Sequence, residues 1–158
     1  MKKTKDTIKV RGFFRIQITE DGKGIIGNSG WKKNQVTNLG FEQYLCQTLG
    51  GMAGSKTVSH IALGTGGAPA AGDTSLAGEI MSSTQRKTVS PSTIASKTLQ
   101  MTAAFASSDS FLTAAANLSN VGLFNTSTTG TLFAGNTFTS SSCNTNQNVN
   151  ITYQIRFS

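Results

Sequence analysis

Residues 8–19 read IKVRGFFRIQIT, and this stretch decides the fold class. Every second position holds an apolar residue or glycine, and most of the positions between them are charged or polar. Because successive side chains of a β-strand point to opposite faces, the alternation predicts a half-buried strand with a basic outer face. The inner positions would be Ile8, Val10, Gly12, Phe14, Ile16 and Ile18.

The far end of the sequence shows the same alternation. Residues 148–157 read NVNITYQIRF, which predicts a second strand of this kind. Its inner positions would be Val149, Ile151, Tyr153, Ile155 and Phe157. Shorter apolar runs predict further strands at 58–63, 86–89, 98–105, 121–124 and 130–138.

Small and polar residues mark the connections between these strands. The Asp21-Gly22 pair predicts a hairpin that returns through residues 24–27. The segments 51–56, 90–96, 125–130 and 139–148 are predicted turns or loops.

Only residues 38–51 have the period of a helix. We expect Asn38 to cap the first turn and Gly50-Gly51 to end the helix after about three turns. The apolar stripe of this helix would consist of Phe41, Tyr44, Leu45 and Leu49.

The composition agrees with a β-rich protein. Charged residues make up 13% of the 158 residues, against about 25% in typical domains, and residues suited to strands and turns are abundant. We predict a mostly β fold, an antiparallel β-sandwich or jelly roll with one short helix. It would form a single domain over residues 8–158, after a basic N-terminal arm at residues 1–7.

Residues 61–80, IALGTGGAPAAGDTSLAGEI, contain a glycine cluster of the kind found in nucleotide-binding loops. A dinucleotide site needs a third glycine at the start of a helix, but Pro69 occupies that position, and the chain has no Walker GK[ST] sequence. We therefore interpret the segment as a structural turn. Its members would be Gly64, Gly66 and Gly67 at positive φ, Pro69 as a stiffener and Asp73 as the cap of a helical turn over 76–80.

The chain offers little for catalysis. Its single histidine, His60, lies in a predicted strand without a neighbouring acid, and its seven acidic residues are scattered. Cys46 and Cys143 have no CxxC or histidine partner, so we expect two free thiols. We predict a non-enzyme with no catalytic residue, metal site or cofactor. Asp73, Glu79 and Asp109 would form ion pairs with Arg86 or Lys97.

No apolar stretch follows the basic MKKTK start, and no run approaches 18 apolar residues. We therefore expect no signal peptide, no membrane contact and synthesis in the cytoplasm.

The net charge of +7 is concentrated at the N-terminal side, where nine of the fourteen lysines and arginines lie within residues 1–33. Such a region can dock on an acidic protein surface or bind nucleic acid. We favour protein contact, because basic and aromatic residues interleave only sparsely and no DNA-reading helix is present. The predicted interface residues are Lys2, Lys3, Lys5, Lys9, Arg11, Phe13, Arg15, Trp31, Lys32 and Lys33.

Three segments occur in an order that resembles a group of small structural proteins of tailed bacteriophages. The first is N-x-V-T-N-x-G at 34–40, the second is ALGTG…P…D-T-x-L-x-x-E at 62–79, and the third is GLF at 122–124 followed by G-x-LFA at 130–134. The resemblance spans about residues 8–158. Family members place an arginine soon after the glutamate, whereas MSSTQ separates Ile80 from Arg86 here, which leaves a Glu79–Arg86 pair open.

This resemblance implies a virion component without enzymatic activity that acts as a symmetric oligomer, often a trimer. We expect a capsid decoration or cement protein, or a head-associated protein, that contacts the major capsid protein or other virion proteins. The alternative within the virion is a tail-fibre, baseplate or neck connector. A nucleic-acid-binding module is a third, less favoured hypothesis.

Overall fold

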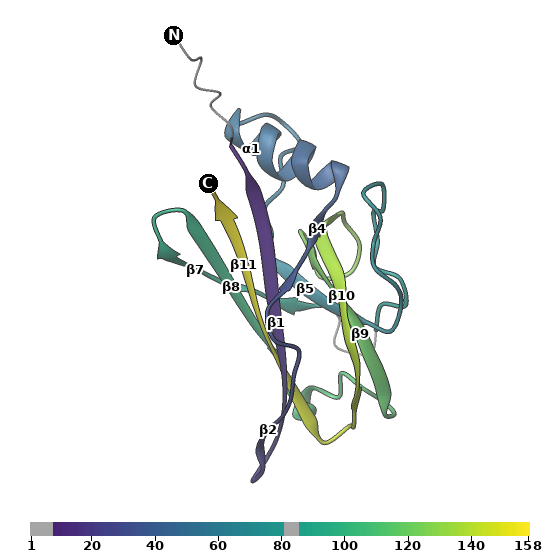
Figure 1. Cartoon of the computed structure of the whole chain (residues 1–158). Helices are drawn as coiled ribbons and strands as arrows, with labels where there is room; N and C mark the ends of the chain where they lie inside the picture. The colour runs from purple at the N-terminus through teal and green to yellow at the C-terminus, as the bar shows by residue number, and fades with distance from the viewer. Residues whose placement is uncertain (1–7, 81–85) are drawn as a thin grey trace.

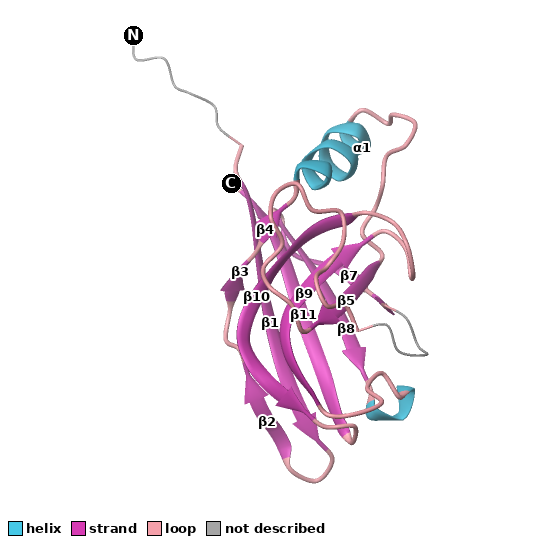
Figure 2. Cartoon of the chain, turned by 90° about the vertical axis from the view of Figure 1, so that its right-hand side faces the viewer, coloured by secondary structure: helices cyan, strands magenta, loops and turns pink. Residues whose placement is uncertain are grey.

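The computed structural model describes residues 8–80 and 86–158. Two antiparallel β-sheets pack face to face as a sandwich, with a short helix at one end and the β1–β2 hairpin at the other (Figures 1 and 2). The predicted fold class is therefore confirmed.

The first sheet has the order β2-β1-β11-β8-β7, with β3 also paired to β1. The second sheet has the order β4-β10-β9-β5-β6. The strands of the first sheet are β1 (Val10–Glu20), β2 (Gly24–Asn28), β3 (Lys32–Lys33), β7 (Ser90–Ala95), β8 (Thr98–Phe105) and β11 (Gln147–Phe157). Those of the second are β4 (Gln35–Val36), β5 (His60–Gly64), β6 (Lys87–Thr88), β9 (Ala116–Phe124) and β10 (Leu132–Cys143).

The two alternating stretches of the sequence pair with each other along their whole length. β1 and β11 run antiparallel from the Val10–Phe157 pair to the Glu20–Gln147 pair. The predicted inner side chains face the second sheet, and Phe14 stacks on Tyr153 with 5.8 Å between the ring centroids. Only the ends depart from the prediction: Ile8 is 84% exposed and Phe157 is 37% exposed.

Two predicted loops are strands in the structure. Residues 90–96 contain β7, which pairs with β8 at the edge of the first sheet. The serine- and threonine-rich part of 139–148 extends β10 as far as Cys143, so that the turn before β11 is short. Most of these side chains are exposed, which removes the apolar alternation on which a strand prediction depends.

The helix begins as predicted but has a different cap. Asn38 already has helical backbone, and the side chain that caps the first turn is Thr37, whose Oγ1 accepts a hydrogen bond from Gly40 N at 2.9 Å. Residues Gly40–Cys46 are π-helical (η1), and Gln47–Leu49 complete one α-helical turn (α1). The wider π turn changes which side chains face the sandwich. Tyr44 is buried, whereas Phe41 and Leu49, both predicted to pack inward, are 45% and 92% exposed.

Residues 34–40 carry the chain from the first sheet to the second, and close contacts hold this segment against strand β1. Asn34 N donates to Gly12 O at 3.0 Å, and the Asn34 carboxamide occupies the space that a side chain at position 12 would need. At the other end of the segment, Gly40 lies against Phe133 O, where a Cβ would overlap the carbonyl. Close backbone approach therefore explains why glycine is needed at positions 12 and 40.

Replacing Gly12 tests this packing. We expect Gly12→Ala to lower the free energy of unfolding by about 1–3 kcal/mol, because the added methyl group collides with the Asn34 carboxamide. Urea unfolding measures the change. Gly67→Ala is the matched control, since nothing lies within 4 Å of a Cβ there, and it should be nearly neutral. The double variant Gly12→Ala/Asn34→Ala should recover part of the loss; a loss unchanged by removing Asn34 would contradict the collision.

Candidate functional site

The glycine-rich segment after β5 is held by close contacts and not by positive φ angles. None of Gly64, Gly66 and Gly67 has a positive φ, so that part of the prediction is wrong. A Cβ on Gly64 would lie 2.9 Å from both Ala77 O and Gly78 O, and a Cβ on Gly66 would overlap Ala77. Gly67 faces open space. Glycine is needed here because residues 77–78 fold back directly onto the strand exit.

Asp73 also has a different role from the predicted one. Its Oδ2 accepts a hydrogen bond from Ala70 N at 2.8 Å, and Asp73 N donates to Ala70 O, so Asp73 closes the turn that precedes it. Residues 76–80 form no helix that Asp73 could cap. Pro69 is buried, with its ring packed near Gly135 of β10. The segment shows no phosphate-binding arrangement and is a folded-back strand exit.

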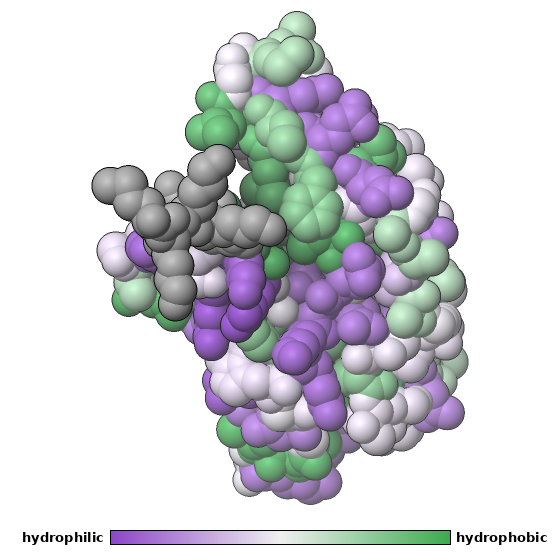
Figure 3. Space-filling model, turned by 45° about the horizontal axis from the view of Figure 1, so that its top comes forward, coloured by the Kyte–Doolittle hydropathy of each residue, from purple (hydrophilic) through white to green (hydrophobic). Residues whose placement is uncertain are grey.

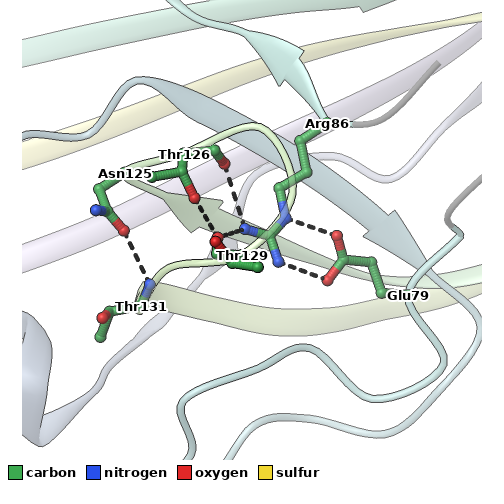
Figure 4. Close-up of polar contacts among 6 residues, drawn as sticks. All are labelled: Glu79, Arg86, Asn125, Thr126, Thr129 and Thr131. Carbon is green, nitrogen blue, oxygen red and sulfur yellow. Dashed lines mark hydrogen bonds and ion pairs between the residues drawn. The ribbon is translucent and has the colours of Figure 1, made fainter.

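Glu79 and Arg86 form a buried ion pair, which the sequence had left open. Arg86 Nε lies 2.6 Å from Glu79 Oε1 and Arg86 Nη2 lies 3.0 Å from Glu79 Oε2, and the two side chains are only 5% and 10% exposed (Figure 4). The guanidinium also donates to the carbonyl oxygens of Thr126 and Thr129. Its Cζ lies 3.4 Å from the Phe124 ring centroid. This single side chain therefore joins the 77–80 segment to the 125–130 loop.

Polar contacts continue from this loop to the helix. Asn125 Oδ1 accepts hydrogen bonds from Thr131 N and from the Tyr44 hydroxyl (Figure 4 shows the first). Lys56 Nζ donates to Thr131 Oγ1 and to Gln43 Oε1. We name Glu79, Arg86, Asn125 and Thr129 the loop clasp. The Glu79 and Arg86 side chains bond each other, and the Arg86 and Asn125 side chains bond backbone groups of the 125–131 region, so the cluster serves to hold the loop in place.

His60 and Asp109 also take part in structural contacts. Burial, followed by the positive charge of Arg86, lowers the pKa of His60, whose Nδ1 lies 2.8 Å from Ser59 Oγ. The hydrogen bond from Lys87 lowers the pKa of Asp109, and the two side chains are 2.8 Å apart. Burial raises the pKa of the Cys143 thiol to about 11, while Cys46 is exposed, and both are free as predicted. Within the described ranges, no three histidine, cysteine or acidic side chains are placed to hold a metal ion.

The predicted interface residues of β1 and β3 do come together. Arg11, Phe13 and Arg15 project from the outer face of β1, and β3 runs beside them, with Lys33 opposite Phe13. Trp31, just before β3, is 43% exposed, and Lys32 and Lys33 are exposed. We name this surface the basic–aromatic face; it comprises Arg11, Phe13, Arg15, Trp31, Lys33 and Arg156. Lys32 lies opposite the inward-facing Phe14 and therefore points to the other face of the sheet.

Cation–π contacts order this face. Arg15 lies over the Trp31 ring at 5.4 Å, and Arg156 lies over the Phe13 ring at 4.5 Å. Arg156 enters from β11, where it is paired with Arg11. Sequence reasoning had placed Arg156 on an outer face but had not joined it to the interface, because the β1–β11 register was needed to bring the two strands together.

The positive charge of the basic–aromatic face is not balanced by acidic neighbours. The ion pairs formed within residues 8–80 and 86–158 are Lys23–Glu20, Arg86–Glu79 and Lys87–Asp109, and none involves this face. Four cations therefore gather beside two aromatic rings without a carboxylate partner in the described structure. Such a surface attracts an acidic ligand.

Of the other predicted cations besides Lys32, only Lys9 lies within the described residues. Lys9 is exposed and ties the start of β1 to the C-terminus through mutual backbone hydrogen bonds with Ser158. Lys2, Lys3, Lys5 and the whole predicted arm at residues 1–7 lie outside the described residues.

A second surface gathers apolar side chains at the helix-bearing end. Phe41, Leu49 and Met52 of the helix region are exposed there, and Ile94 and Phe157 are exposed on the neighbouring strand ends. Figure 3, which brings this end forward, shows green hydrophobic atoms beside purple hydrophilic ones. We name these five residues the apolar end. A hollow of about 220 Å³ separates Leu45 of the helix from Leu99 and Ile155 of the first sheet.

Comparison with known proteins returned no matching family model, no matching curated protein and no matching solved structure. Among the helices of the described residues, none is long and apolar enough to cross a membrane.

We predict that the buried ion pair of the loop clasp contributes more to the free energy of unfolding than the Lys23–Glu20 pair does. We expect Glu79→Gln to lower the free energy of unfolding by about 3 kcal/mol, because it leaves the Arg86 charge buried without its counter-charge. The control is Lys23→Gln, which removes the exposed Lys23–Glu20 pair and should leave the urea midpoint unchanged. Equal shifts for the two variants would show that the loop clasp contributes no more than a surface pair.

Proposed function

We propose that this protein is a non-enzymatic structural component of a bacteriophage virion, most simply a capsid decoration or cement protein or another head-associated protein. Two arguments support the proposal. The order of the three sequence segments resembles that of small phage structural proteins. Among the side chains that could act in catalysis, His60 bonds a neighbouring serine, Asp73 closes a turn, and Glu79 and Asp109 form ion pairs.

The observation that carries the proposed mode of action is the uncompensated charge of the basic–aromatic face. A rigid two-stranded platform, β1 with β3, presents these cations on the surface of a sandwich. Long-range attraction would bring this face to an acidic capsid surface, and burial of Trp31 and Phe13 would hold it there. The partner is therefore the major capsid protein or another acidic virion protein.

Location in the tail is the alternative within the virion, as a tail-fibre, baseplate or neck connector. The two locations differ in copy number, because a shell carries hundreds of sites and a tail carries about a dozen or fewer. Nucleic acid is the less favoured partner: the basic–aromatic face has only two rings, Phe13 and Trp31, on which bases could stack.

Attachment to particles tests the role of the face. We expect Arg15→Gln/Arg156→Gln to weaken co-sedimentation with virions lacking the protein by about tenfold at low salt, because it removes two cations of this face that have no acidic partner in the described residues. Lys23→Gln/Lys97→Gln changes the net charge equally away from the face and should bind normally. The same loss in both variants would refute a role for this face, and binding to DNA but not to particles would favour the nucleic-acid hypothesis.

The protein is also proposed to act as a symmetric homo-oligomer, with a trimer as the expected form. The apolar end supports self-association, because five large apolar side chains are exposed on the helix region and on strand ends, and exposed apolar surface commonly marks protein contacts.

Sedimentation velocity of the isolated protein tests this association. We expect Leu49→Ser to shift the protein toward the monomer, because Leu49 is 92% exposed within the apolar end. Ile25→Ser is the matched control, since Ile25 is 59% exposed on the hairpin at the opposite end of the sandwich. A wild-type protein that sediments as a monomer at high concentration would contradict the oligomer.

A further inference from the structure

Strand β1 is fully paired on one side and only partly paired on the other. On the β11 side, the ladder runs over the whole of Val10–Glu20. On the opposite side, β2 pairs with residues 17–20 and β3 with residues 13 and 14. Within the described residues, no strand lies beside Val10–Gly12 on that side.

The register shows which backbone groups this leaves open. Lys9 and Ser158 exchange both of their backbone hydrogen bonds, so Lys9 and then Arg11 direct their polar groups toward β11. The backbone groups of Val10 and Gly12 point the opposite way. Gly12 O accepts the hydrogen bond from Asn34 N at 3.0 Å. The N–H groups of Val10 and Gly12 and the carbonyl of Val10 remain for a further strand.

A groove runs beside this open edge. It has a volume of about 440 Å³ and is bounded by residues 10–13 of β1, by residues 33–36 where the chain crosses from β3 to β4, and by Phe41 of the helix. After Lys33 the chain leaves the first sheet, and β4 then pairs with β10 of the second sheet. The corner between the two sheets is left open beside this connection. Val36 contributes a buried apolar wall, and Phe41 an exposed ring.

The positive charge beside the groove favours an acidic ligand. Arg11 and Lys33, both exposed, stand on either side of it, and neither has an acidic partner in the described residues. The first seven residues of the chain carry three lysines and one aspartate, so the same charge disfavours them as the occupant. An extended segment with acidic side chains matches both the edge and the cations.

We propose that the groove beside Val10–Gly12 binds an extended acidic segment of a partner protein, which adds to the first sheet as a short β-strand. Main-chain hydrogen bonds to Val10 and Gly12 supply the register, Arg11 and Lys33 pair with acidic side chains, and an apolar side chain packs against Phe41. The proposal rests on the proposed attachment function, since it names how the partner is held next to the basic–aromatic face.

A synthetic peptide probes the groove directly. The probe is a short peptide in which glutamates alternate with valines and threonines, added to the full-length protein and followed by amide hydrogen exchange. We expect exchange at Val10 and Gly12 to slow by at least about tenfold at saturation, because these N–H groups become hydrogen-bonded. Arg11 is an internal control, since its N–H faces β11 and should not change.

Two changes separate strand addition from simple charge attraction. Methylating the peptide's backbone nitrogens on one edge, or replacing Val10 with proline, removes a hydrogen bond and should weaken binding about 2- to 10-fold. Proline is compatible with an open strand edge, and the methylated peptide leaves the protein itself unaltered. Arg11→Gln should weaken binding and its salt dependence, whereas Lys97→Gln should not.

The outcomes distinguish this inference from the proposed function. Slowed exchange at Val10 and Gly12 together with sensitivity to N-methylation supports strand addition. Equal binding of the methylated and unmethylated peptides overturns it and leaves charge attraction intact. Failure of the peptide to bind, while co-sedimentation with virions still depends on Arg15 and Arg156, also overturns strand addition but preserves the attachment function. If the peptide does not bind and co-sedimentation with virions does not depend on the basic–aromatic face, both strand addition and the attachment function are overturned.

Discussion

The antiparallel ladder between β1 and β11 is the constraint on which the rest of this structure depends. It joins the two ends of the chain over the whole of Val10–Glu20 and buries one face of each strand against the second sheet. Because side chains alternate along both strands, the same pairing that places Phe14 against Tyr153 inside also places Arg11 opposite Arg156 outside. The core and the charged surface are consequences of one register.

Three glycines are needed because other backbone or side-chain atoms approach them closely. Gly12 leaves room for Asn34, Gly40 for the Phe133 carbonyl, and Gly64 for the fold-back at residues 77–78. The buried Glu79–Arg86 pair closes the loops at the edge of the second sheet. A buried ion pair is costly to desolvate, so its value here lies in the arrangement that it specifies, with four oxygen partners around one guanidinium.

The surface features that support the proposed function meet at one corner of the sandwich, where the basic–aromatic face lies beside the open edge of β1. The chain leaves the first sheet after Lys33, and this departure both aligns the basic–aromatic face and exposes the edge of β1 at Val10–Gly12. Open strand edges are usually covered or blunted, because they pair readily with other chains. Here the edge lies between two unpaired cations, which restricts the segments that it accepts to acidic ones.

The sequence by itself determined the fold class, the inner and outer faces of the long strands and the β1–β2 hairpin, because period-two alternation and turn residues act locally. It missed β7 and the end of β10, whose exposed serines and threonines carry no alternation, and it misplaced the helix cap because Thr37 is fixed by the carbonyl of Leu132, far along the chain. Only the tertiary structure decided that Arg156 joins the basic–aromatic face, that Arg86 reaches Glu79 and that the edge of Val10–Gly12 away from β11 has no strand beside it in the described residues. Each of these depends on which distant strands become neighbours, and local sequence does not encode that choice.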